Sequence, residues 1–189
     1  EIYLLRYCRR FFAIALLLFT GQAYLAFAEE PPQVEQIFKL FDSGETMSRE
    51  AIEKNVALLE QYISSDDIER IEKLNQIKCW SQPSDDEGQI TNALNYAEQM
   101  LSHIPSTASA HFITDITLCH AWFLQLSGDI SGAMEGYNKG VKSAYAHEDI
   151  KLIADARSLR GALHSYIGDF SEALDDLVTA QGLYESLNL

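Results

Sequence analysis

Two cysteines of this chain lie where a covalent cross-link could form. Cys79 and Cys119 are 40 residues apart, each in a segment with the apolar spacing of a helix. An oxidising compartment would favour a disulfide. However, equivalent positions on neighbouring helices are about 8–10 Å apart, whereas the Cα atoms of a disulfide usually lie within about 7 Å. Two interpretations stay open: a disulfide made possible by a small register shift, or two buried free thiols.

The other residues that could do chemistry show no catalytic or metal-binding pattern. The histidines lack metal-site spacing, and we interpret them as structural or surface residues: His103, His111, His120, His147 and His164. The acidic runs 85–87 and 175–176 lack the alternating oxygens of a calcium loop, so we interpret them as solvated charge near helix ends. The sequence contains no phosphate-binding glycine loop, nucleophile elbow or paired-carboxylate cleft. We therefore expect no enzymatic activity, metal or cofactor in this chain.

Composition narrows the class of partner. The chain has 189 residues, is 47% hydrophobic and carries a formal net charge of −14. Such a chain is long enough for a sizeable core, but its acidity argues against binding to nucleic acid or to an anionic lipid surface. The simplest role of the charge is to keep the surface soluble.

The N-terminal residues 1–28 have the pattern of a signal peptide. Three arginines precede an unbroken apolar run over 11–19, and Ala26-Phe27-Ala28 supplies small residues before a cleavage point. The run is shorter than a membrane-spanning helix, which needs about 20 residues. We expect a cleaved signal and a periplasmic location, with an uncleaved anchor as the alternative.

The remaining chain has helical periodicity throughout and little strand signal. We expect helices over 33–42, 48–63, 67–82, 89–104, 108–126, 131–146, 149–166 and 171–187. Short loops predict that successive helices pack antiparallel. Asp66 with Glu69, and Asp169 with Glu172, have the spacing of capping boxes. The core is expected to include Trp80, Phe123 and Tyr137.

A phrase recurs every 40 residues, beginning at Gly88, Gly128 and Gly168. Glycine permits a left-handed turn between two helices, and Asp129 or Asp169 can cap the second helix. Ile90, Ile130 and Phe170 would pack over the turn, and the following small residues would let the two helices approach closely: Ala93, Ala133 and Ala173. A fixed period of this length in a helical chain predicts an α-solenoid of helix pairs.

These residues resemble the tetratricopeptide repeat. The segment "RGALHSYIGDFSEALDDLVTA" has that family's glycine in the first helix and small residues in the second, at Gly161, Ala173 and Ala180. It departs from the family at Arg157, Arg160 and His164, where Trp, Leu and Tyr are preferred, and in its 40-residue period. The resemblance implies a right-handed solenoid with a degenerate helix pair over 29–64, then three repeats over 65–189 that are truncated at the C-terminus.

The resemblance also implies a concave groove for a peptide or partner protein. By register, its lining would be Lys78, Gln82, Leu118, Trp122, Gln125, Ser158, Ala162, Ser165 and Tyr166. Trp122 and Tyr166 have an alternative role as core residues between helices. The chain could also pair with a second copy of itself.

A narrower resemblance concerns signalling. The segments "KLNQIKCWSQ" and "LCHAWFLQLSGDISGAMEGYNKGV" are similar to the periplasmic sensory region of membrane-bound diguanylate cyclases from marine gammaproteobacteria. That resemblance implies a non-catalytic input domain, joined to the membrane through its N-terminal segment or a downstream span. The alternatives are a free-standing periplasmic scaffold and a cytosolic helical-repeat regulator.

Overall fold

The computed structural model describes residues 33–43 and 46–189, so the predicted signal segment lies outside the described residues. The described chain is all α-helical, as predicted. Its helices are α2 (Gln33–Asp42), α3 (Arg49–Tyr62), α4 (Ile68–Trp80), α5 (Glu87–Ser102), α6 (Ala110–Ser127), α7 (Ile130–Ala146), α8 (Ile150–Ile167) and α9 (Phe170–Ser186). No helix within these ranges combines the length and apolarity needed to cross a bilayer.

The described residues divide into two compact units, one ending at Ser43 and one beginning at Gly44. The first contains α2, an amphipathic helix with Val34, Ile37 and Phe38 on one face. The second contains α3 to α9 and all the residues discussed below. The predicted helices agree with the observed ones to within two residues at each end, because the apolar spacing and the breaks at proline and glycine are strong local signals.

Two glycines make the turns that the repeated phrase predicts. Gly128 and Gly168 follow α6 and α8 with φ of 90° and 88°, in the left-handed region. After the first, the Asp129 side chain accepts a hydrogen bond of 2.9 Å from the backbone N–H of Gly132 and so caps α7. The prediction for Gly88 was wrong. Asp86 caps α5, so Gly88 lies within the first turn of that helix rather than in a left-handed turn.

Three further local predictions were wrong. Asp67, not Asp66, is the N-cap of α4, and its carboxylate accepts from the N–H of Arg70. Asp169 stands at the N-cap of α9 but makes no capping hydrogen bond with its side chain. Phe170 does not pack over its turn, because 70% of it is exposed. Sequence patterns fix the place of a cap to a residue or so, but hydrogen-bond geometry decides which side chain acts.

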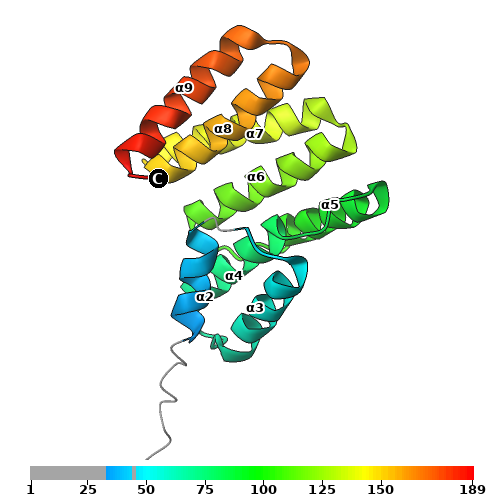
Figure 1. Cartoon of the computed structure of the whole chain (residues 1–189), viewed down its shortest axis with the longest axis vertical. Coiled ribbons are helices and arrows are strands. Elements are labelled where there is room, and N and C mark those ends of the chain that lie inside the picture. The colour runs from blue at the N-terminus through cyan, green and yellow to red at the C-terminus, as the bar shows by residue number, and fades with distance from the viewer. Residues whose placement is uncertain (1–32, 44–45) are drawn as a thin grey trace, which may run out of the picture. The chain divides into compact units, whose positions relative to one another are not determined.

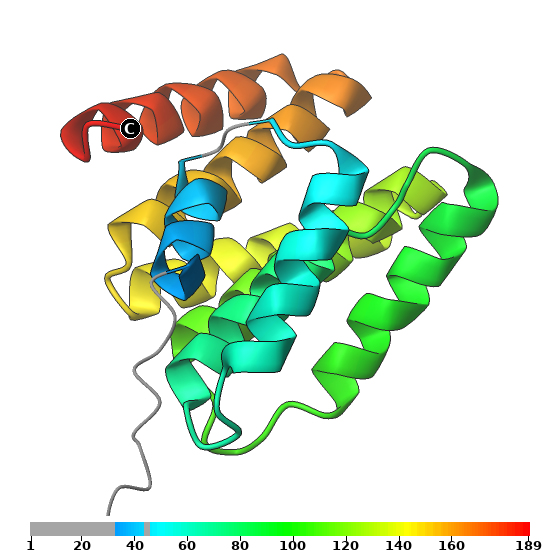
Figure 2. The same ribbon diagram turned by 60° about the horizontal axis from the view of Figure 1, so that its bottom comes forward.

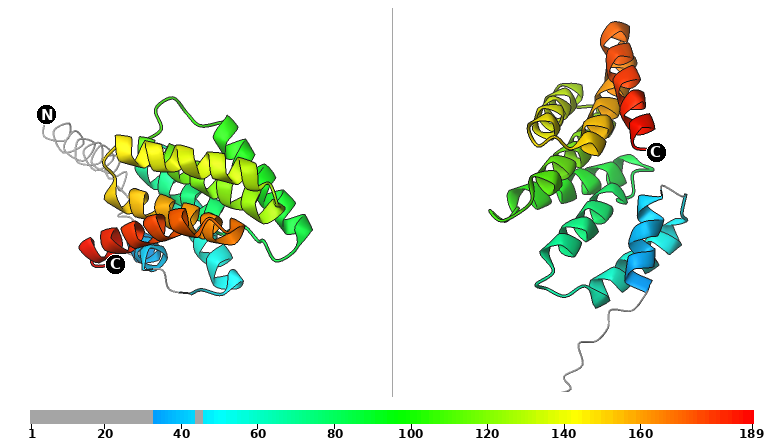
Figure 3. Two further views of the ribbon diagram at one scale, coloured as in Figure 1. Left: turned by 90° about the horizontal axis from the view of Figure 1, so that it is seen from above. Right: turned by 90° about the vertical axis from the view of Figure 1, so that its left-hand side faces the viewer.

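Successive helices of the second unit pack side by side. Figure 1 shows α6, α7, α8 and α9 in succession, and each contacts the next. The turned views of Figure 2 and Figure 3 show α8 beside α9 in the same way. Contacts also join α4 to α6 and α6 to α8, which places helices 40 residues apart next to one another.

Two apolar clusters form the core of this unit. One surrounds Cys79 and Cys119 between α4, α5 and α6, and the other joins α6, α7 and α8 around Tyr137. Phe123 and Tyr137 are buried, as predicted, and so are the three small residues of the repeat, Ala93, Ala133 and Ala173. Trp80 is not a core residue. It is 38% exposed, and its indole N–H donates to the carboxylate of Asp115.

The contact between α6 and α7 has no room for a side chain at Gly136. A Cβ atom there would lie 2.6 Å from the Cβ of Ala121, which has no rotatable side chain with which to give way. We expect Gly136→Ala to destabilise the fold by about 1–3 kcal/mol through overpacking. At Gly182 on α9 the same atom meets nothing within 4 Å, so Gly182→Ala should stabilise by about 0.5–1 kcal/mol through helix propensity. Urea unfolding of both variants measures the change in unfolding free energy. Equal changes in the two variants would contradict the close approach of α6 and α7.

Candidate functional site

The two cysteines are joined by a disulfide between α4 and α6. Their Cα atoms are 6.4 Å apart, and neither residue is exposed. The expected separation of about 8–10 Å for equivalent positions on neighbouring helices therefore overestimates the Cα–Cα distance of this pair. The two helices approach more closely here. Of the two interpretations that the sequence left open, the structure contains the cross-link. It ties two helices that are 40 residues apart in the chain.

The predicted groove residues differ in exposure. They divide by exposure into Ala162, Ser165 and Tyr166, which are exposed, Lys78, Gln82, Trp122, Gln125 and Ser158, which are partly buried, and Leu118, which is buried. Leu118 packs against Gly140 on α7, and Gln125 accepts a hydrogen bond of 2.9 Å from the hydroxyl of Tyr137. These two side chains therefore belong to the α6–α7 interface and not to a groove. One helical face carries both, because they are seven residues apart.

The other predicted groove residues differ in the contacts that they make. Lys78 forms an ion pair of 2.7 Å with Glu60, and the side-chain amide of Gln82 donates to the Lys78 carbonyl. Trp122 packs against the cluster around the disulfide. Tyr166 is 74% exposed, so its alternative role as a core residue was wrong.

A polar row crosses the helices α4, α6, α8 and α9 of this unit. It consists of Trp80, His111, Asp115, Asp149, Lys151, Asp155 and Tyr184. The indole of Trp80 donates to Asp115 over 2.9 Å, and the ring of His111 lies 2.6 Å from the Asp149 carboxylate. Asp115 is also within electrostatic reach of Asp155 on α8. The row thus links side chains that are far apart in sequence.

The second half of the row is centred on one carboxylate. Asp155 accepts hydrogen bonds of 2.8 Å from the Lys151 ammonium and 2.7 Å from the Tyr184 hydroxyl. Lys151 and Asp155 are the 40-residue equivalents of His111 and Asp115. These positions were not among the predicted groove residues, although they lie about one to two turns before residues 118 and 158 and share the repeat register.

The acids of the polar row differ in their electrostatics. Burial raises the pKa of the Asp115 carboxyl, and the Trp80 hydrogen bond opposes this shift only in part. Burial also acts against ionisation of Asp149, but the hydrogen bonds from His111 and from the Leu152 N–H give it a lowered pKa overall. The row therefore combines carboxyl groups whose pKa values are shifted in opposite directions with the indole donor of Trp80, which suits recognition of a polar chain.

A second cluster surrounds a buried carboxylate on α9. Asp176, which we had interpreted as solvated charge, is only 2% exposed. Arg160 donates to both of its oxygens over 2.7 and 2.8 Å, and Arg157 donates over 3.1 Å. Arg157 also stacks on the ring of Tyr145 at 5.5 Å. Arg157 and Arg160 are thus the partners of one buried acid.

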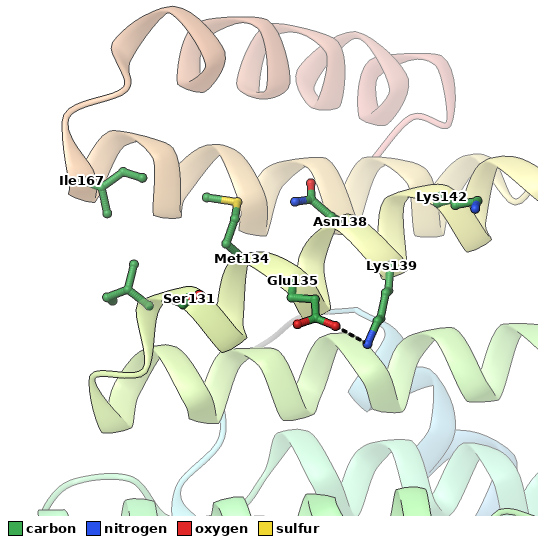
Figure 4. A pocket seen from close by; sticks show the side chains of 8 residues that line it. Ser131, Met134, Glu135, Asn138, Lys139, Lys142 and Ile167 are labelled. Carbon is green, nitrogen blue, oxygen red and sulfur yellow. Dashed lines mark ion pairs between the residues drawn. The ribbon is translucent and has the colours of Figure 1, made fainter.

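A shallow hollow lies along α7 and the end of α8 (Figure 4). It is lined by Ile130, Ser131, Met134, Glu135, Asn138, Lys139, Lys142 and Ile167. Figure 4 shows Met134 and Ile167 near one end, and Lys139 and Lys142 toward the other. Lys139 pairs with Glu135 over 2.6 Å. Within the described residues, no group of three His, Cys, Asp or Glu side chains is placed to hold a metal ion.

Comparison with known proteins gives little further guidance. No family model matches the chain, and no curated protein matches it. Among solved structures, the chain is similar to BtubC (BKLC) from P. vanneervenii, with 16% identity, a TM-score of 0.43 and coverage of 82% of this chain. The chain spans 58% of the length of that protein. A likeness at this level carries no argument about function.

The disulfide closes a segment of 40 residues. In the chain-entropy account, such a cross-link restricts the unfolded state and contributes about 4 kcal/mol. We expect the double variant Cys79→Ser, Cys119→Ser to lose about that much unfolding free energy in urea titrations under oxidising conditions. Under reducing conditions the two proteins should differ far less. A loss of the same size in both conditions would assign the effect to packing instead.

The carboxylate of Asp176 holds two guanidinium groups, so its removal should be costly. We expect Asp176→Asn to destabilise the fold by about 3–5 kcal/mol, because it leaves Arg157 and Arg160 without their buried counter-charge. The neighbouring Asp175 also contacts Arg157, but its side chain is 75% exposed. Asp175→Asn should therefore cost less than about 1 kcal/mol. Thermal unfolding of both variants tests this, and a similar loss in both would rule out the buried role of Asp176.

Proposed function

We propose that this chain is a non-catalytic interaction module, a right-handed α-solenoid of antiparallel helix pairs that binds a segment of a partner protein. The 40-residue register supports the solenoid: the disulfide joins α4 to the equivalent position on α6, and α6 in turn contacts α8. The repeats would extend over 65–189, after a degenerate helix pair over 29–64. In such a stack, the first helix of each pair lines one face.

The observation that carries the binding proposal is the polar row. It places an indole, a phenol, an imidazole, an ammonium group and three carboxylates on neighbouring helices, with Trp80 and His111 partly open to solvent. Peptide backbones are recognised by such donors and acceptors, with aromatic side chains as anchors. The exposed Tyr166, Ser165 and Ala162 on α8 extend the surface. The partner segment would lie across α4, α6 and α8.

The charge of the row indicates the chemistry of that segment. The row has three aspartates, Asp115, Asp149 and Asp155, beside one lysine and one histidine, and the whole chain carries a formal net charge of −14. A segment with Lys or Arg side chains would meet complementary charge and be steered to the surface. We therefore propose an extended basic peptide as the preferred occupant.

The cellular setting is proposed from the resemblance. The first candidate is a periplasmic input domain of a membrane-bound diguanylate cyclase, in which partner binding is transmitted to a signalling domain. The second is a free-standing periplasmic scaffold for envelope complexes. Reading the gene beyond the codon for Leu189 separates them, because a membrane span and a GGDEF motif in the same frame would establish the input domain. A fusion of residues 1–40 to a reporter active only after export tests the location.

A peptide-display selection tests the binding function directly. We expect the intact chain to select peptides rich in Lys or Arg, and Asp155→Asn with Tyr166→Ala to weaken the selected peptides by about tenfold or more. Circular dichroism would verify that the double variant is folded. The matched control is Glu135→Gln with Lys139→Ala on α7, which leaves the row intact. Selection of no peptides, or equal loss in the control, would contradict a binding site on the polar row.

A further inference from the structure

Helix α9 carries an apolar stripe that other helices of the second unit leave uncovered. Phe170, Leu174, Leu177 and Val178 recur at helical spacing, and they are 70%, 65%, 40% and 59% exposed. Among the helices of residues 46–189, α9 packs on α8, and Figure 1 shows α9 at the end of the succession α6 to α9. A contiguous apolar stripe of this size marks an interaction surface.

The contact between α7 and α8 is a template for what such a stripe binds. Forty residues earlier, α7 has Ile130 and Met134 at the positions of Phe170 and Leu174, and both pack against the core cluster that includes α8. Tyr137, the equivalent of Leu177, is completely buried in that cluster. The stripe on α9 therefore repeats the face with which α7 receives the next helix. Its shape suits a packed helix rather than an extended chain.

The same template specifies the apolar face of the occupant. Helix α8 contributes Leu152, Ile153, Ala156, Leu159 and Leu163 to the cluster that it shares with α6 and α7, and four of these residues recur at i, i+4, i+7 and i+11. This spacing gives an amphipathic helix with one narrow apolar stripe, and the small residue within it allows close approach. A helix with this pattern would present the same face to α9.

Charge determines the rest of the partner's chemistry. Helix α9 carries three exposed acidic residues, Glu172, Asp175 and Glu185, and no basic one, whereas its fourth acid, Asp176, is buried against Arg157 and Arg160 of α8. Two copies of α9 packed on each other would bring like charges together, which is unfavourable. We propose that the apolar stripe of α9 docks a basic amphipathic helix of a partner protein, in the way that α7 docks α8. This surface is separate from the polar row and does not depend on the proposed function.

The probe for this surface is a synthetic peptide with the sequence of residues 150–167, capped at both ends. We expect it to bind the full chain in isothermal titration calorimetry, with an affinity that falls as salt rises. The double variant Leu174→Ser, Val178→Ser should weaken binding by about tenfold or more. These side chains are exposed, so the variant should keep its melting temperature. Ile68→Ser, at a 55% exposed position of α4, is the matched control and should bind normally.

Three results would overturn the proposal. The first is an absence of binding by the peptide. The second is unchanged binding to the Leu174→Ser, Val178→Ser variant, which would mean that the peptide displaces α8 from α7 instead. The third is a dimer in sedimentation analysis that the same variant converts to a monomer, since a second copy would then be the occupant.

A peptide with its three basic residues replaced by Glu should bind more weakly. Equal binding of the two peptides would contradict a basic partner. Loss of peptide-display binding at the polar row would leave these outcomes unaffected.

Discussion

Helices α6 and α7 approach one another so closely that α7 has no room for a side chain where Gly136 meets Ala121. This close contact is the constraint on which the packing of α6 on α7 depends. In the same interface Leu118 lies over Gly140, and Tyr137 is completely buried. The positions 40 residues later are Gly161 and Asp176, where a Cβ atom on Gly161 would lie 3.0 Å from the Cβ of Asp176, so α8 and α9 also approach closely.

The buried charge of Asp176 depends on residues of the neighbouring helix. An acid at the α8–α9 contact would be very unfavourable alone. Here two arginines of α8 contribute several charge-assisted hydrogen bonds, and the hydroxyl of Tyr145 on α7 accepts a hydrogen bond from Arg157. Arg157, Arg160 and Asp176 therefore form one charged unit across the α8–α9 contact.

The second unit offers two different surfaces. The polar row combines aromatic groups and carboxylates across α4, α6, α8 and α9. The stripe on α9 is apolar, with exposed acidic residues on the same helix. The disulfide ties α4 to α6 beside the polar row.

The sequence by itself determined the helices and the 40-residue period, because both depend on local apolar spacing and on turn residues. It also determined which small residues are buried, since Ala93, Ala133 and Ala173 follow from that period. Only the tertiary structure decided which face each side chain meets. Leu118 and Gln125 contact α7, Trp80 donates a hydrogen bond to Asp115, and Asp176 pairs with arginines 16 and 19 residues earlier. These outcomes depend on partners distant in sequence, and a local pattern carries no information about where such partners lie.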